Sequence, residues 1–204
     1  QWKMLVGAGM TNGDSAVLSY ASPDLLSWTY QGPFLRDGSM RSVRMWECPN
    51  FFPAGDQYAL LISLFPDIQG VYYYLGDYDG RQFSPTAEGF FESGPLFYAP
   101  QARLFPDGRV ILIGWILEDR TERASLQAGW AGLQSLPRQL TINRQGRLVS
   151  HPIDEVEQLR GDQQSFSGVK LEPGEAFRLP KTGQCLEIEA VFAVEEGRGG
   201  REIL

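Results

Sequence analysis

Glu47 is the residue whose type and surroundings best suit acid–base chemistry. It stands within Met45–Asn50 (MWECPN), where one charged side chain interrupts an otherwise apolar stretch. Aromatic and thiol neighbours remove water from a carboxyl group and raise its pKa, as a general acid working near neutral pH requires. The alternative is a glutamate at a strand end whose carboxylate simply extends into water. The residues themselves leave both interpretations open.

Other catalytic chemistries have few residues to support them. His151 is the single histidine, and Cys48 and Cys185 are the two cysteines. No Cys-x-x-Cys or Cys/His spacing indicates a zinc site, and no Ser-His or Cys-His pair indicates a nucleophilic triad. We therefore expect no metal and no cofactor, and assign any catalysis to carboxylates. Two distant cysteines fit a reducing or an oxidising compartment, but their spacing is not disulfide-like, which favours the bacterial cytoplasm over secretion.

The composition is typical of a globular protein that binds neither nucleic acid nor membranes. The 204 residues carry a formal net charge of -7 and are 43% hydrophobic. Phosphate binding needs clustered Lys and Arg, and none cluster here. No apolar run approaches the roughly 18 residues of a membrane span, and no signal peptide is visible.

These residues must be positioned by short strands, because strongly apolar runs recur about every 50 residues. The runs are Trp2–Ala8, Tyr58–Phe65 and Val110–Ile116. A turn at Phe105–Gly108 precedes the third run, where Pro and Gly preset the turn angles. A repeat of this length is typical of a β-propeller blade. Generic repetition of β-hairpins is the alternative on these internal matches alone.

The expected fold class is therefore all-β, a partial propeller of about three blades in residues 1–150, followed by the start of a β-sandwich. Residues 151–162 form a polar linker with apolar residues at a short helical spacing, and the composition changes again from 163 to 204. A closed propeller has roughly four to eight blades, so we expect N-terminal blades of the same protein to be missing as partners. In the last region, alternating strands are expected at Ser165–Leu171, Ala176–Leu179 and Cys185–Val194.

With these features the chain resembles glycoside hydrolase family 32, the family of invertases, levanases and sucrose-6-phosphate hydrolases. Trp46–Pro49 (WECP) matches the family motif that carries the general acid/base, so the resemblance gives that role to Glu47. It covers nearly the whole chain up to residue 160 and implies a five-bladed propeller followed by a β-sandwich. Further matching motifs are Tyr98–Gln101 (YAPQ), Asp107–Trp115 (DGRVILIGW), Trp130–Leu140 (WAGLQSLPRQL) and Gly146–Arg160 (GRLVSHPIDEVEQLR).

The resemblance also implies two catalytic carboxylates that this sequence lacks. Family members carry a nucleophilic Asp in an Asn-Asp-Pro segment and a sugar-gripping Asp in an Arg-Asp-Pro segment, and neither tripeptide occurs here. Gln1–Gly9 resembles the stretch that follows shortly after the second segment. We therefore expect the isolated chain to be inactive, because an acid without a nucleophile cannot form the fructosyl intermediate. The family most often has Asp where Asn50 stands.

At other matched positions the resemblance implies contact with the sugar or with the acid. Trp115 would line the fructose pocket, with a core tryptophan between blades as the alternative. Tyr98 and Trp130 would also bind substrate. Cys48 would pack beside Glu47, either supporting its pKa or simply filling space.

Two further residues are expected to be structural. Arg138, in PRQL, is expected to be an ion-pair partner, and His151 an exposed linker residue.

The implied activity is retaining hydrolysis of β-fructofuranosides, in which two carboxyl groups about 5–5.5 Å apart flank the bond. The substrate would be a small molecule or an oligosaccharide: sucrose, sucrose 6-phosphate or a fructan. The alternatives are a non-catalytic carbohydrate-binding propeller protein, or a fructosyltransferase in which a sugar rather than water attacks the intermediate.

Overall fold

The computed structural model describes residues 1–38, 43–66, 70–92, 94, 96–180, 183 and 185–193. The chain divides into two compact units, Gln1–Asp154 and Glu155–Leu204. Among the described residues, no helix is long and apolar enough to cross a membrane.

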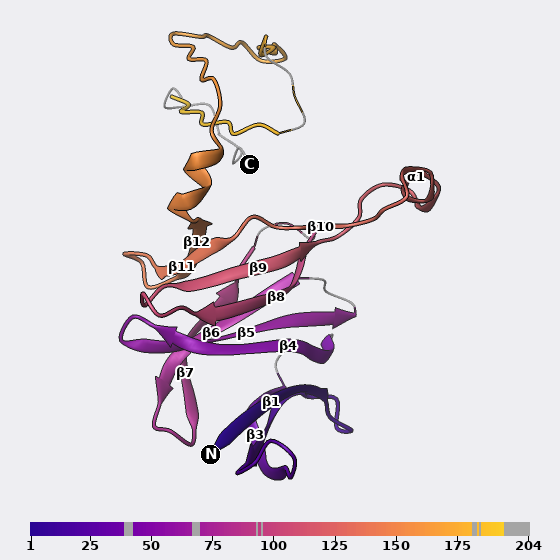
Figure 1. Cartoon of the computed structure of the whole chain (residues 1–204), viewed down its shortest axis with the longest axis vertical. Coiled ribbons are helices and arrows are strands. Elements are labelled where there is room, and N and C mark those ends of the chain that lie inside the picture. The colour runs from indigo at the N-terminus through magenta and orange to yellow at the C-terminus, as the bar shows by residue number, and fades with distance from the viewer. Residues whose placement is uncertain are drawn as a thin grey trace. The chain divides into compact units, whose positions relative to one another are not determined.

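The first unit consists of three antiparallel sheets, and in the first two each strand pairs with the next along the chain (Figure 1). The first sheet contains β1 (Trp2–Gly9), β2 (Ser15–Ser22) and β3 (Thr29–Asp37). The second contains β4 (Val43–Ala54), β5 (Gln57–Pro66), β6 (Gly70–Tyr78) and β7 (Phe83–Phe90). The third contains β8 (Phe97–Leu104), β9 (Val110–Ile116), β10 (Leu133–Gln134), β11 (Arg138–Ile142) and β12 (Leu148–Pro152).

The three apolar runs predicted to be equivalent strands are β1, β5 and β9. The turn expected at Phe105–Gly108 connects β8 and β9, and the Gly108 N–H donates to the Phe105 carbonyl. In the third sheet, β10 and β11 both pair with β9 on the side away from β8, so together they occupy one strand position. Each sheet is thus an up-and-down meander, as expected of a propeller blade.

The middle sheet packs on both of its neighbours because its alternate residues are apolar on both faces. Leu60 and Ile62 of β5 belong to a core cluster with Val17 and Phe34 of the first sheet. Their neighbour Leu61 belongs to a second cluster, with residues of the third sheet such as Leu112. Stacking of successive sheets therefore builds two hydrophobic clusters, one on each face of the middle sheet, and the sheets do not close into a ring.

β1 and β4 approach each other closely where β1 carries glycines. A Cβ built on Gly7 would lie 2.0 Å from the backbone oxygen of Trp46, and one on Gly9 would lie 2.1 Å from that of Arg44. Because no side chain fits in that space, glycine is required at both positions. The contact fixes β1 against the segment of β4 that carries Glu47.

Helix α1 (Glu122–Ala128) lies at the tip of an arm that projects from β9 and β10 (Figure 1). The Thr121 side chain caps its N-terminus by accepting from the Ala124 N–H, and Gly129 ends it with a left-handed φ of 78°. No residue of this helix is buried.

The second unit differs from the sequence expectation. A 3₁₀ helix, η1 (Asp154–Leu159), begins at the last residue of the first unit and agrees with the short helical spacing of the linker. The described residues after it contain no strand, so the strands expected at Ser165–Leu171, Ala176–Leu179 and the described part of Cys185–Val194 are not formed. Their side chains are exposed, and isolated short strands without a packed face have little to stabilise them. The β-sandwich and the domain boundaries stay predictions.

Candidate functional site

Glu47 lies on β4 at the start of a β-bulge. Glu47 pairs with Ser63 of β5 but Asn50 pairs with Leu61, so β4 has one extra residue between them. Cys48, within the bulge, has a φ of 47°, which is in the left-handed region. Bulges of this kind bend a strand and redirect a side chain, and they are frequent next to active sites.

The immediate neighbours of Glu47 differ from those expected. Successive side chains of a strand point to opposite faces. Trp46 is fully buried in the core, with its ring 5.6 Å from that of Tyr74, whereas Glu47 is only partly buried. The indole was expected beside the carboxylate, and strand alternation places it in the core instead.

A second bulge of the same form lies on β8. Tyr98 pairs with Trp115 of β9 but Gln101 pairs with Ile113, and Ala99 between them has a φ of 45°. Glu-Cys-Pro-Asn and Tyr-Ala-Pro-Gln are thus equivalent segments of neighbouring sheets. Each segment has a Pro two residues after Glu47 or Tyr98. This shared spacing is the sequence signal that the two segments are equivalent, and matching each motif separately did not reveal it.

The two bulges bring Glu47 and Tyr98 into direct contact. The Tyr98 hydroxyl donates to Oε2 of Glu47 at 2.7 Å, and it lies 3.1 Å from the Leu64 carbonyl oxygen. Tyr98 is buried, and burial followed by its hydrogen bond to Glu47 raises the pKa of its phenol above the ordinary value. Tyr98 therefore keeps its proton at any physiological pH and serves Glu47 as a neutral donor.

Cys48 is half-buried beside these groups. Burial, and secondarily the Glu47 carboxylate, raise the pKa of the Cys48 thiol. The thiol therefore stays protonated near neutral pH and is a poor nucleophile. This agrees with a supporting rather than a reactive residue.

Trp115 lies next to Tyr98 because the two are paired across β8 and β9. Its side chain is 50% exposed, so it is not the core tryptophan that the sequence left as an alternative. A Cβ built on Gly132 would lie 2.5 Å from the indole nitrogen, so the backbone of the arm packs directly against one edge of the ring. Trp115 thus offers an open aromatic surface beside the Glu47–Tyr98 pair.

Trp130 lies in the arm after α1 and has different partners. The Arg120 guanidinium lies 3.9 Å from its ring centre, and Arg120 also pairs with Glu118 at 2.5 Å. This pairing and the Gly132 N–H hold the pKa of the Glu118 carboxyl at about 2. One face of Trp130 is therefore covered by Arg120, while half of the side chain stays exposed. Whether it contacts a sugar stays a prediction.

Two expectations about structural residues are met. Arg138 pairs with Glu92 at 2.5 Å and lies over the Phe97 ring, as expected of an ion-pair partner. His151 is exposed as expected, although it belongs to strand β12 rather than to a loop. In the part of the chain that the structure describes, no three His, Cys, Asp or Glu side chains are grouped to hold a metal ion.

Asn50 and Ser63 are buried polar residues that the sequence analysis did not assign to the site. The Asn50 amide donates to the Cys48 carbonyl at 2.8 Å and to the Pro100 carbonyl at 2.9 Å, and its oxygen accepts from the Ala102 N–H at 2.8 Å. Ser63 Oγ accepts from the Ala99 N–H at 3.2 Å. Both residues therefore connect the second sheet to the bulge on β8.

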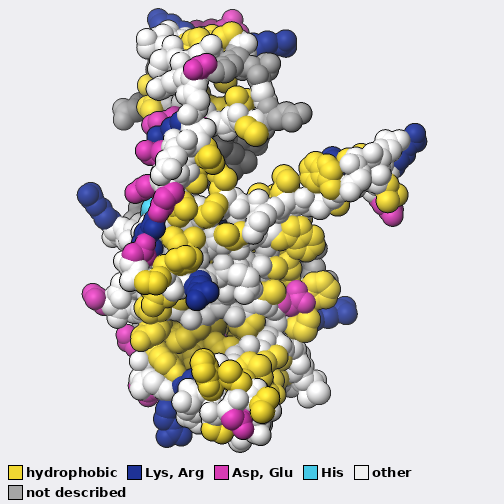
Figure 2. All heavy atoms as spheres, in the orientation of Figure 1, with side chains coloured by type: hydrophobic (Ala, Val, Ile, Leu, Met, Phe, Trp, Pro, Cys, Tyr) yellow, Lys and Arg dark blue, Asp and Glu magenta, His cyan; other side chains and the backbone are white. Residues whose placement is uncertain are grey.

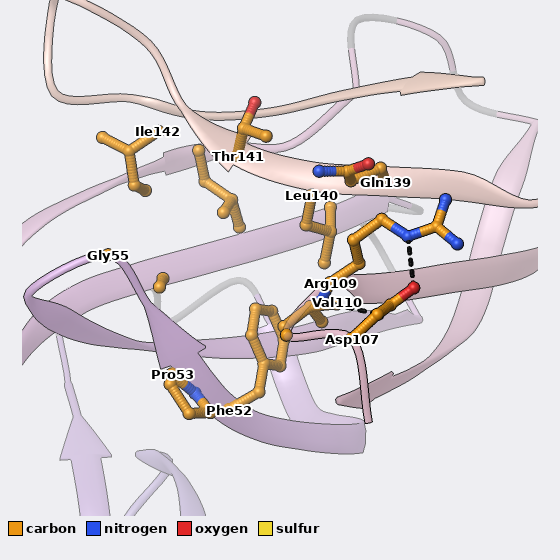
Figure 3. Close-up of a pocket in the computed structure, with 13 residues that line it drawn as sticks. Phe52, Pro53, Gly55, Asp107, Arg109, Val110, Gln139, Leu140, Thr141 and Ile142 are labelled. Carbon is orange, nitrogen blue, oxygen red and sulfur yellow. Dashed lines mark hydrogen bonds and ion pairs between the residues drawn. The ribbon is translucent and has the colours of Figure 1, made fainter. Parts of the chain in front are cut away.

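A separate cavity of about 260 Å³ opens at the far end of β4, between the β4–β5 turn, the β8–β9 turn and β11 (Figure 3). Ala54 at the cavity lies seven positions after Glu47, on the order of 20 Å along a strand. Asp107 at its rim accepts the Arg109 backbone N–H and pairs with the Arg109 side chain at 2.7 Å. These bonds lower the pKa of the Asp107 carboxyl, which therefore stabilises the turn as an ionised group.

The visible face of the sheets carries many hydrophobic side chains, while Lys and Arg are scattered over it (Figure 2). The distribution gives no basic patch on this face that would suit a nucleic acid.

Comparison with known proteins identifies relatives of the chain. Residues 1–152 match the model of the glycosyl hydrolases family 32 N-terminal domain. The chain is 32% identical to the sucrose-6-phosphate hydrolase of Escherichia coli, over 95% of this chain and 42% of that protein. It therefore spans less than half the length of this relative.

Solved structures of related enzymes also match the chain. A mutant of the GH32 β-fructofuranosidase from Bombyx mori, in complex with sucrose, matches with a TM-score of 0.68 and 30% identity, over 79% of this chain and 36% of that one. A fructan 1-exohydrolase IIa variant from Cichorium intybus, in complex with 1-kestose, matches with a TM-score of 0.69 and 25% identity, over 79% and 34%. The expected all-β fold with a partial propeller is thereby confirmed.

Proposed function

The chain belongs to glycosyl hydrolase family 32, and from this membership we propose that the whole protein hydrolyses β-fructofuranosides, with Glu47 as its general acid/base. The substrate class is sucrose, sucrose 6-phosphate or a fructan. The observation that carries the proposal is the partly buried Glu47 carboxyl, held at a bulge by the Tyr98 hydroxyl beside an exposed Trp115. The nucleophile is not supplied by these 204 residues.

Glu47 would act twice in a retaining reaction. In the first step a nucleophilic carboxylate attacks the anomeric carbon of fructose, the glycosidic C–O bond breaks, and protonated Glu47 gives its proton to the departing oxygen. In the second step the Glu47 carboxylate takes a proton from water as that water displaces the enzyme carboxylate and releases fructose. The bulge favours this assignment because it directs the side chain away from the core that holds Trp46.

Tyr98 would change its hydrogen bonds as Glu47 gives up or regains its proton. Its hydroxyl has one proton and two oxygen neighbours, Glu47 Oε2 and the Leu64 carbonyl. It donates to Glu47 when that residue is ionised. When Glu47 is protonated, the carboxyl can donate to the phenol oxygen while the phenol donates to Leu64. Tyr98 thus stabilises the state left after proton transfer.

Trp115 would bind the sugar by its ring. Half of the indole is exposed and lies across the strand pair from Tyr98. An aromatic face suits the apolar C–H face of a sugar and costs little conformational entropy. Trp130, with one face covered by Arg120, is the weaker candidate for a second contact.

The test is fructose release by the whole protein from sucrose, sucrose 6-phosphate and inulin. Glu47→Gln should lower kcat by about 10²–10⁴-fold, the usual contribution of a general acid, without changing the fold. Glu122→Gln, on the exposed helix α1, is the matched control and should retain full activity.

Activity of Glu47→Gln within a few-fold of wild type would remove Glu47 from the mechanism. Sugar binding without fructose release by the wild type would favour a binding protein. Oligosaccharide products at high sucrose would favour a fructosyltransferase.

A further inference from the structure

We propose that Asn50 is a positioning residue that locks the bulge carrying Tyr98 onto the bulge carrying Glu47. This inference rests on the proposed acid/base role of Glu47 and adds the device that sets its geometry. Asn50 itself does not touch the reacting atoms.

The hydrogen bonds of Asn50 join the two bulges directly. One proton of its amide goes to the Cys48 carbonyl, inside the bulge on β4, and the other to the Pro100 carbonyl, inside the bulge on β8. Its oxygen accepts from Ala102, just past the second bulge. The side chain is 8% exposed, so these bonds are shielded from competing water. Asn50 thus fixes the distance between the backbones on either side of the Glu47–Tyr98 contact.

Both bulges need such support because each contains a residue in a strained conformation. Cys48 and Ala99 have φ values of 47° and 45°, a conformation that is strained for a residue with a Cβ. Such conformations persist only where surrounding contacts determine them. Asn50 bonds to Pro100 within the Ala99 bulge and to Ala102 just past it, and Ser63 Oγ accepts from the Ala99 N–H itself. Residues of the second sheet therefore hold the β8 bulge in place.

The amide of Asn50 suits this position in a way that a carboxylate does not. Two of its three partners are carbonyl oxygens, at 2.8 and 2.9 Å, and both require a donor. An ionised carboxylate there would face two acceptors with no proton to share. Asn50 therefore joins the two bulges with a neutral group.

The test is a double-mutant cycle on the whole protein. Asn50→Ala should lower kcat/KM by about 10–100-fold, mostly through kcat, because small displacements of a catalytic group are costly. It should leave the KM for sucrose nearly unchanged, because Asn50 does not contact the sugar. In the Tyr98→Phe background, the further loss from Asn50→Ala should be less than about 3-fold, because the contact it positions is already gone.

The matched control is Asn143, whose side-chain oxygen accepts from Gln145 and Arg147 in a turn. Asn143→Ala should leave kcat and KM unchanged. If Asn50→Ala does not fold, Ser63→Ala decides: it removes one bond to the same bulge and should produce a smaller loss of kcat that also disappears in the Tyr98→Phe background.

The inference would be overturned if Asn50→Ala lowered kcat/KM equally in both backgrounds, or hardly at all, while Glu47→Gln still lost most of its activity. Full activity of Glu47→Gln would instead overturn the proposed function.

Discussion

The Tyr98 hydroxyl holds the Glu47 carboxyl in place by a hydrogen bond of 2.7 Å. Tyr98→Phe removes this bond and leaves the carboxyl without the donor that orients it. A hydrogen bond to a charged group is worth about 1.5–3 kcal/mol, so we expect the kcat on sucrose to fall by about 10–100-fold.

The measurement is the kcat of the whole protein on sucrose. Tyr30→Phe, at a half-exposed tyrosine on β3, should leave it unchanged. An unchanged kcat in Tyr98→Phe would show that the hydroxyl does not position Glu47.

At this scale the sequence predicts Glu47 as the reactive group but does not predict all the residues that contact it. Glu47 is conspicuous because it is the charged residue in MWECPN, and Tyr98 and Trp115 were named from matching motifs. Which side chain contacts Glu47 depends on the register between strands far apart in the sequence. For that reason Trp46 was expected beside the carboxyl and Asn50 was not assigned a structural role.

At the scale of the elements, the close contact between β1 and β4 supports the site. Gly7→Ala would place a methyl group 2.0 Å from the Trp46 backbone oxygen and 3.2 Å from the Glu47 Cα. The strands must separate, and overpacking of this kind costs about 1–3 kcal/mol. We therefore expect a lower free energy of unfolding together with a reduced kcat, since the strand that carries Glu47 is displaced.

Thermal or denaturant unfolding of the whole protein measures the expected loss of unfolding free energy. The kcat on sucrose measures the expected loss of activity. Gly161→Ala, where an added Cβ meets no neighbour, is the control. Unchanged stability in Gly7→Ala would contradict the close packing of β1 on β4.

The sequence predicts strands well where apolar runs recur at a regular spacing along the chain. β5 and β9 were anticipated because Tyr58–Phe65 and Val110–Ile116 are nearly continuous apolar runs of strand length. The bulges could not be predicted, since an extra residue on one strand is defined only against its partner. Alternation alone overpredicted the second unit, where Leu186 and Ile188 are exposed and not in strands.

At the scale of the whole molecule, we expect the acid and the nucleophile of the reaction to come from different segments of the protein. The 204 residues contain Glu47 but neither an Asn-Asp-Pro nor an Arg-Asp-Pro tripeptide, where the family resemblance implies the other carboxylates. The purified chain should therefore release no fructose from sucrose or fructan, because no glycosyl intermediate can form. Turnover by this chain, with contaminating activity excluded by an identically purified Glu47→Gln preparation, would disprove that separation.

If Glu47 protonates the leaving oxygen, the loss of kcat/KM caused by Glu47→Gln must depend on how much protonation the leaving group needs. Comparing two substrates with different leaving groups therefore tests this role of Glu47. In the whole protein, kcat/KM should fall by about 10²–10⁴-fold on sucrose, whose leaving alkoxide needs the proton. On a nitrophenyl β-fructofuranoside, whose leaving phenolate needs little protonation, it should fall by less than about 10-fold. Equal losses on the two substrates would contradict the assignment of Glu47 as the general acid.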